Sequence, residues 1–145
     1  RPVLHWRAVV QLSPLAYLVI DRSDCDIPQM LRFHVPSGAD LEKLQLLPLC
    51  GLAPAQCPAK DYPTQTGDAY VTEEIQFAVT DPSCSVLLLQ VDVNDNTTLT
   101  TGQGGNISLQ HKDFAVELHS LPQGSFIISD LKNSRRQEIP LNGTG

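Results

Sequence analysis

Short apolar runs separated by turn-forming residues recur along the chain and constrain its fold more than any other feature. The runs combine leucine, β-branched and aromatic side chains, and proline, glycine, serine or aspartate stands between them. Runs at intervals of about eight to twelve residues are typical of β-sandwiches and jelly rolls. We therefore predict an antiparallel all-β sandwich or jelly-roll-like domain of about eight strands. The clearest runs span residues 3–12, 15–20, 30–35, 69–80, 85–93, 113–119 and 125–131.

Three segments of the chain differ from the alternating runs. The run SVLLLQVDV at 85–93 is a nearly continuous apolar run that ends in alternation, which is typical of a central strand. The run at 39–50 is compatible with a short helix or a strand, and a strand is slightly favoured because Pro48 would break the last helical turn. Residues 51–67 are rich in proline and are expected to form one long loop.

Length and charge limit the class of protein. A chain of 145 residues fits one domain. Its net charge of −6 argues against nucleic-acid binding, which needs clustered lysine and arginine. No apolar run approaches the about 20 residues that span a bilayer, so we expect no membrane insertion by this segment. The chain begins at Arg1 rather than at a methionine, and we expect residues 1–145 to be one extracellular domain excised from a larger protein.

The four cysteines indicate an oxidising compartment. They are even in number and lack the CxxC or CxxH spacing of zinc sites, so two disulfides are expected. Of the three possible pairings we favour Cys25 with Cys84 and Cys50 with Cys57, because the second pair would close the proline-rich loop. The other two pairings stay open.

Three N-glycosylation sequons point to the same compartment. Each has the pattern N-x-[ST] and falls in a polar, turn-like segment. We therefore expect a glycoprotein that is secreted or exposed at the cell surface. The acceptors are Asn96, Asn106 and Asn142.

Two acidic clusters raise the question of calcium, because Ca²⁺ prefers six to eight oxygen ligands. The segment DVNDN at 92–96 resembles the inter-domain calcium linker of cadherins, and this resemblance implies a calcium site. A threonine follows it where cadherins have proline, and Asn96 is itself a sequon acceptor. We therefore interpret the segment as a glycan-bearing turn, expect no cofactor, and keep calcium as the alternative. Its candidate ligands are Asp21, Asp24, Asp26, Asp92 and Asp95.

Nothing in the sequence predicts catalysis. There is no GxSxG nucleophile motif, and the adjacent Glu73 and Glu74 would point to opposite faces of a strand. The histidines are scattered and lack metal-ligand spacing. They are His5, His34, His111 and His119.

These observations together predict a non-catalytic, N-glycosylated extracellular module that mediates protein–protein interaction, of receptor or adhesion type. Its partner surface should be free of sequons, and the N-terminal strands and the Cys50–Cys57 loop meet that condition. The alternative is a calcium-dependent or carbohydrate-binding, lectin-like module that uses the acidic loops.

Overall fold

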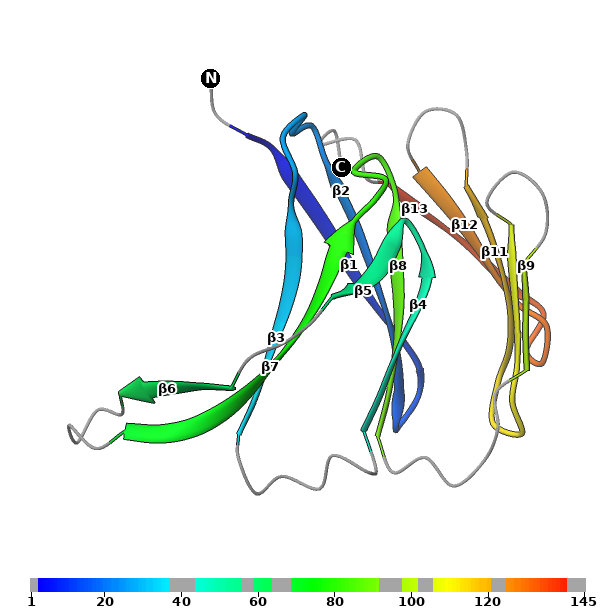
Figure 1. Ribbon diagram of the computed structural model, residues 1–145. Helices are drawn as coiled ribbons and strands as arrows, with labels where there is room; N and C mark the ends of the chain where they lie inside the picture. The colour runs from blue at the N-terminus through cyan, green and yellow to red at the C-terminus, as the bar shows by residue number, and fades with distance from the viewer. Residues whose placement is uncertain are drawn as a thin grey trace.

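The computed structural model describes residues 3–36, 44–55, 59–63, 69–91, 98–101, 106–120 and 125–140 (Figure 1). For residues 34–36, 59–63, 69–74, 98–101 and 120 it describes the backbone alone. Within these ranges the chain consists of thirteen strands and their connections. No helix in the described part of the chain has the length and apolar character needed to cross a membrane. The prediction of an antiparallel all-β fold is confirmed.

The strands form three antiparallel sheets rather than one sandwich of about eight strands. Sheet A has the order β1 (His5–Ser13), β2 (Ala16–Ser23), β8 (Ser85–Val91), β4 (Leu44–Cys50). Sheet B has the order β3 (Met30–Pro36), β7 (Ala69–Val79), β5 (Leu52–Ala55), and β6 (Ala59–Pro63) also pairs with β7. Sheet C has the order β13 (Arg135–Pro140), β12 (Ser125–Asp130), β11 (Ala115–Ser120), β10 (Ile107–Gln110), β9 (Thr98–Thr101).

Sheet A is the central layer, with sheet B on one face and sheet C on the other (Figure 1). Side chains alternate across a strand, so neighbouring residues of β8 point to opposite layers. Leu88 belongs to the core shared with sheet C, whereas Leu87 belongs to the core shared with sheet B. Both side chains are fully buried. This double burial explains the continuous apolar run of β8, and it confirms the prediction that the run is a central strand.

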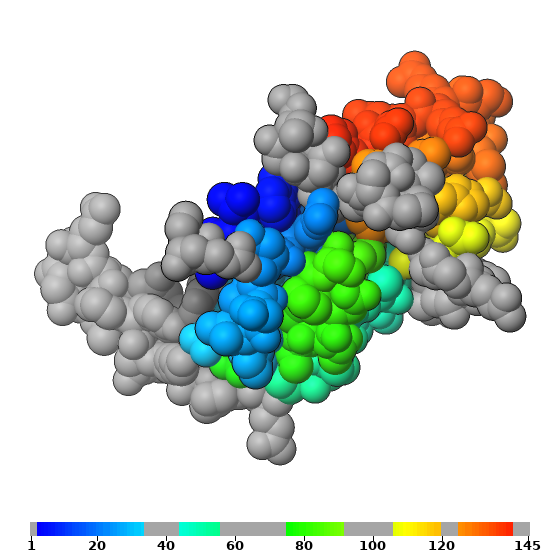
Figure 2. Space-filling view, turned by 90° about the horizontal axis from the view of Figure 1, so that it is seen from above, coloured from blue at the N-terminus to red at the C-terminus, as the bar shows by residue number. Residues whose placement is uncertain are grey.

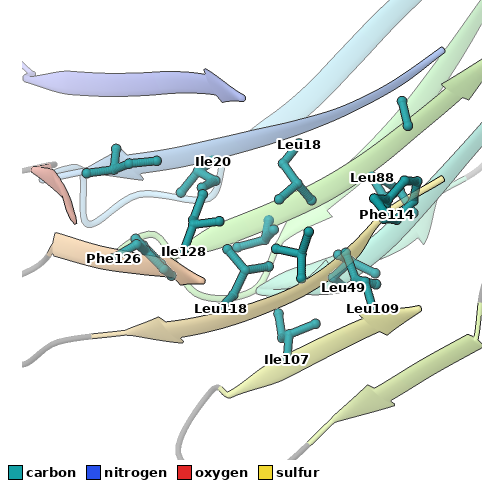
Figure 3. Packing of buried hydrophobic residues seen from close by; sticks show 14 residues of the cluster. Leu18, Ile20, Leu49, Leu88, Ile107, Leu109, Phe114, Leu118, Phe126 and Ile128 are labelled. Carbon is teal, nitrogen blue, oxygen red and sulfur yellow. The ribbon is translucent and has the colours of Figure 1, made fainter. Parts of the chain in front are cut away.

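The larger of the two cores lies between sheets A and C (Figure 3). Sheet A contributes leucine, isoleucine and valine from β2 and β8, and sheet C contributes aliphatic and phenylalanine side chains from β10, β11 and β12. Leu18, Ile20, Leu109 and Leu118 are fully inaccessible to solvent. The inward residues of β1, including Trp6 and Val10, cover one margin of this core.

The smaller core lies between sheets A and B. Its buried residues are Val19, Leu87 and Phe77. The rings of Phe33 and Phe77 meet edge to face, with centroids 6.3 Å apart. Half-buried side chains of both sheets complete this core, including Leu31.

The structure corrects the sequence interpretation in two places. Residues 51–67 are not one long loop, because they include β5 and β6. Pro54 is tolerated in β5 because that strand pairs with β7 on one side only, at the edge of sheet B. Strand β13 was not predicted, since its side chains are exposed except for Ile139.

The interpretation of 39–50 as a strand is confirmed for Leu44–Cys50. Pro48 lies in this edge strand beside a register shift.

Candidate functional site

The hairpin of β1 and β2 places a cluster of charged side chains on the face of sheet A that points toward sheet B. Its register pairs Arg7 with Asp21 across the two strands. His5 lies two residues before Arg7 and therefore on the same face. The hairpin thus brings two basic side chains to one carboxylate.

The cluster is held by charge-assisted hydrogen bonds. Arg7 donates from Nε to Oδ1 of Asp21 at 2.7 Å and from Nη2 to Oδ2 at 3.0 Å. Nε2 of His5 lies 3.2 Å from the same Oδ1. The carboxylate is largely buried, with 10% of its side chain exposed, whereas 46% of the Arg7 side chain is exposed. Hydrogen bonding between the Arg7 and Asp21 side chains raises the pKa of Arg7, and it outweighs burial, which would lower that pKa.

A pocket of about 320 Å³ opens over this cluster, between sheets A and B. Arg7, Asp21 and Ser85 of sheet A line one side of it. Apolar side chains of the facing strands β3 and β7 line the other, namely Met30, Leu31 and Val79. The pocket therefore combines an oriented guanidinium group with an apolar wall.

Four apolar side chains at this end of the molecule are exposed, and we call them the N-terminal apolar patch. Val3 is 55% exposed, Leu4 52%, Ile27 67% and Met30 40%. Val3 and Met30 line the pocket, while Ile27 lines a neighbouring hollow that shares Gln29, Val79 and Pro82 with it. Two hydrogen bonds join the patch segments. Leu4 donates to Oδ1 of Asp24 at 2.8 Å, and the Asp24 amide donates to the Leu4 carbonyl at 3.1 Å.

Figure 2 views the molecule from this end. The blue residues of β1, β2 and the β2–β3 connection lie beside the green residues of β7 and β8. The yellow and orange strands of sheet C lie on the other side of sheet A. The pocket, lined by residues of sheets A and B, therefore lies on the side of sheet A that faces sheet B.

The predicted calcium ligands do not come together in the described part of the chain. Asp21 is occupied by Arg7 and His5, Asp24 accepts the Leu4 amide, and Asp26 is exposed. Nowhere in the described residues do three or more histidine, cysteine, aspartate or glutamate side chains form a group that could hold a metal ion. Asp92 and Asp95 lie outside the described residues.

One of the three predicted glycosylation sites is described. Asn106 is exposed and immediately precedes β10 in sheet C. Its Oδ1 lies 3.1 Å from Nδ1 of His119, so the amide nitrogen, which would carry a glycan, is not used in that contact. Asn96 and Asn142 lie outside the described residues.

The favoured cysteine pairing differs from the arrangement in the structure. Cys84 lies beside Cys50, with 3.8 Å between the two Sγ atoms, rather than beside Cys25. The physical reason is that Cys50 and Cys84 pack against the core between sheets A and C, whereas Cys25 lines the hollow beside sheet B. The three described cysteines are unbonded, because a disulfide has sulfurs about 2.05 Å apart. Cys57 lies outside the described residues.

His111 and His119 make local contacts in β11 and the segment before it. His111 stacks on Phe114 with ring centroids 4.9 Å apart, and its Nδ1 accepts the Asp113 amide at 3.1 Å. Nε2 of His119 lies 3.5 Å from Glu117 on the exposed side of β11. His34 lies in β3, and its side chain is outside the described residues.

Sequence reasoning missed the cluster of His5, Arg7 and Asp21 because Asp21 was grouped with the acidic residues that follow it. A hairpin turn at Pro14 would have indicated the cluster, since folding the chain there sets Arg7 opposite Asp21.

Comparisons with protein-family models, with curated proteins and with solved structures found no match to this chain.

Proposed function

We propose that this chain is a non-catalytic, N-glycosylated extracellular module of a cell-surface or secreted glycoprotein, and that it binds a protein partner through the end formed by β1, β2 and β3. The observation that carries this proposal is the pocket between sheets A and B, whose lining includes Val3 and Met30 of the N-terminal apolar patch. The rest of the proposal, namely two disulfides and the oxidising compartment, rests on the cysteines and sequons of the sequence.

The composition of this surface favours a protein ligand. Binding hot spots in protein interfaces combine apolar anchors with arginine around a central concavity. Arg7 is held by its two hydrogen bonds to Asp21, so it would lose little conformational freedom when a partner contacts its exposed side. Val3, Ile27 and Met30 would supply apolar contact area around it.

The same surface gives less support to a sugar or calcium ligand. Trp6, the single tryptophan of the chain, packs against the core between sheets A and C and is covered by Arg22, whose guanidinium carbon is 5.3 Å from the ring centroid. It is therefore not placed to stack on a sugar in the pocket. Asp21 is neutralised by Arg7, which leaves its oxygens poorly suited to a cation.

The position of Asn106 is compatible with a partner at the pocket. A glycan on Asn106 would project from sheet C, whereas the pocket lies on the sheet B side of sheet A. Such a glycan would mask part of sheet C and leave the proposed binding end uncovered.

The compartment is tested by expressing the chain behind a secretory leader in mammalian cells. We expect secretion and a loss of apparent mass after treatment with peptide N-glycosidase F. The variant Ser108→Ala should lose the Asn106 glycan alone, because it removes the hydroxyl of that sequon. A secreted chain that carries no N-glycan would contradict this part of the proposal.

Partner binding is tested by screening the glycosylated chain, displayed as a multimer, against an array of secreted and cell-surface ectodomains. A partner identified there should bind the variant Met30→Arg at least about tenfold more weakly, because a charge would enter the apolar rim. Leu131→Arg is the matched control, since Leu131 is 48% exposed in the turn after β12 of sheet C. If the array yields no partner, or if the partner binds Met30→Arg as tightly as wild type, the proposal that this end of the molecule binds a protein is overturned.

A further inference from the structure

Cys50 and Cys84 are brought together by neighbouring strands of sheet A. Cys50 is the last residue of β4, and Cys84 immediately precedes β8, which pairs with β4. Their Sγ atoms are 3.8 Å apart, although the residues are 34 positions apart in the sequence. Both side chains pack against the core between sheets A and C. They therefore lie on one face of the sheet, as a bridge between them requires.

The backbone around this pair is fixed. Gly51 has a φ of +68°, which turns the chain from β4 into β5. Its carbonyl accepts the amides of Thr80 at 2.8 Å and Asp81 at 3.3 Å, and the Cys84 amide donates to the Asp81 carbonyl at 3.3 Å. A side chain at position 51 would overlap the carbonyl oxygen of Cys84. The β4–β5 corner and the β7–β8 turn are thus in direct contact beside the two sulfurs.

Cys25 is placed differently. It lines the hollow near sheet B with Ile27 and Pro82, and its Sγ lies 3.9 Å from the Ile27 carbonyl oxygen. A bridge from Cys25 to Cys84 would have to pass from one face of sheet A to the other.

We propose that Cys50 and Cys84 form a disulfide when the chain meets a small disulfide oxidant such as oxidised glutathione, so that the β4–β5 corner is joined covalently to the β7–β8 turn. This proposal is independent of partner binding. It assigns a pairing that the spacing of the cysteines in the sequence does not favour.

The exchange proceeds in two balanced steps. The Cys50 thiolate attacks one sulfur of oxidised glutathione, forming a mixed disulfide and releasing one glutathione thiolate. The Cys84 thiolate then attacks Cys50 Sγ and releases the second glutathione thiolate. The protons lost by the two cysteines convert the released thiolates to two molecules of glutathione. The oxidant thus gains the two electrons that the cysteines lose.

The electrostatics of the pair support Cys50 as the first nucleophile. A hydrogen bond shared with Cys84 lowers the pKa of Cys50 to about 7, although burial and Asp81 act in the opposite direction. The same hydrogen bond and burial raise the pKa of Cys84. Capping Cys50 with glutathione removes the negative charge that opposes ionisation of Cys84.

The bridge would also fix one wall of the pocket. The β7–β8 turn that ends at Cys84 contains Pro82, which lines the pocket, and the Pro82 carbonyl accepts the Ser23 amide at 2.7 Å. A covalent link at Cys84 limits the movement of this turn relative to sheet A.

The pairing is tested by peptide mapping of the secreted chain under non-reducing conditions, after removal of N-glycans and alkylation of free thiols. Trypsin leaves Cys25 in peptide 23–32, Cys84 in peptide 61–112, and the other two cysteines together in peptide 44–60. Adding chymotrypsin, which cuts after Leu52, separates Cys50 from Cys57. We expect a fragment carrying Cys50 linked to one carrying Cys84. A link from Cys84 to Cys25 or Cys57, or an alkylated Cys84, would overturn the proposal.

Two matched variants, each of which retains only two of the four cysteines, test which pair can form a disulfide. Cys25→Ala/Cys57→Ala retains the proposed pair, and Cys50→Ala/Cys57→Ala retains Cys25 and Cys84. After equilibration with reduced and oxidised glutathione, the first variant should have no free thiols and the second should have two. Reduction should lower the Tm of the first variant by about 5–10 °C and leave the second unchanged. Free thiols in the first variant would contradict the proposal, and if either variant does not fold, the wild-type peptide map decides.

Discussion

The two faces of sheet A differ in what they bury. Among the side chains that the structure describes, fourteen buried apolar residues form one core toward sheet C, whereas three form the buried core toward sheet B. The sheet B face also carries the pair of Arg7 and Asp21 and the pocket above it. A large apolar interface stabilises the fold, and a smaller one with a charged, accessible margin is available to a ligand. We infer that one face of sheet A provides stability and the other provides the binding surface.

Adjacent residues of β8 test this difference most directly, because Leu88 faces sheet C and Leu87 faces sheet B. Leu88→Ala should lower the free energy of unfolding by about 3–5 kcal/mol, near the upper end for a buried leucine. Leu87→Ala should cost about 2–3 kcal/mol, since the smaller core can relax around the lost side chain. Urea denaturation of both variants measures the difference. An equal or larger loss for Leu87→Ala would show that the two layers contribute alike.

The corner between sheets A and B is expected to be the next most sensitive point. Gly51→Ala should lower the free energy of unfolding by about 2–4 kcal/mol, because the residue has a positive φ and its new side chain would overlap the Cys84 carbonyl. Ala53→Gly, two residues away in β5, is the control and should cost about 1 kcal/mol or less. Chemical denaturation compares them. A neutral Gly51→Ala would mean that the β4–β5 corner rearranges freely.

The two arginines of the β1–β2 hairpin test the same difference, because Arg7 contacts Asp21 beside the pocket and Arg22 lies over Trp6 at the core between sheets A and C. Arg7→Gln removes the charged partner of the largely buried Asp21 and should cost about 1–2 kcal/mol, a value reduced for the partial exposure of Arg7. Arg22→Gln removes a cation over Trp6 and should cost about 0.5–1 kcal/mol. Thermal and urea denaturation measure both. If Arg22→Gln were the more costly change, the charged cluster would not be the main polar support of the hairpin.

Part of this architecture could be predicted from the sequence, because alternation and burial leave a local pattern. The run at 85–93 predicted a central strand, since a strand covered on both faces has apolar residues at consecutive positions. β13 could not be predicted, because it is an edge strand with one buried side chain, Ile139. β5 could not be predicted because it contains Pro54, a residue that an edge strand tolerates.

The candidate site was less predictable than the fold, because it depends on pairing between strands. No local pattern connects Arg7 with Asp21 until the register of the hairpin is known. The contact between Cys50 and Cys84 likewise depends on the pairing of β4 with β8 across a long intervening segment. Sequence spacing favours short cysteine loops, whereas the layers of the sheet decide which thiols share a face.

The smallest expected effect lies in the exposed turn that joins β12 to β13 in sheet C. In the turn between β12 and β13, hydrogen bonds from Asn133 and Lys132 lower the pKa of Asp130. A carboxylate with a lowered pKa in the folded state stabilises the fold above its unfolded pKa of about 3.9, and this contribution is lost as the pH falls through the folded value. Asn133→Ala should therefore destabilise slightly at pH 6, and its difference from wild type should shrink below about pH 4. Denaturation at both pH values measures this, and a difference that grew on acidification would contradict the assignment.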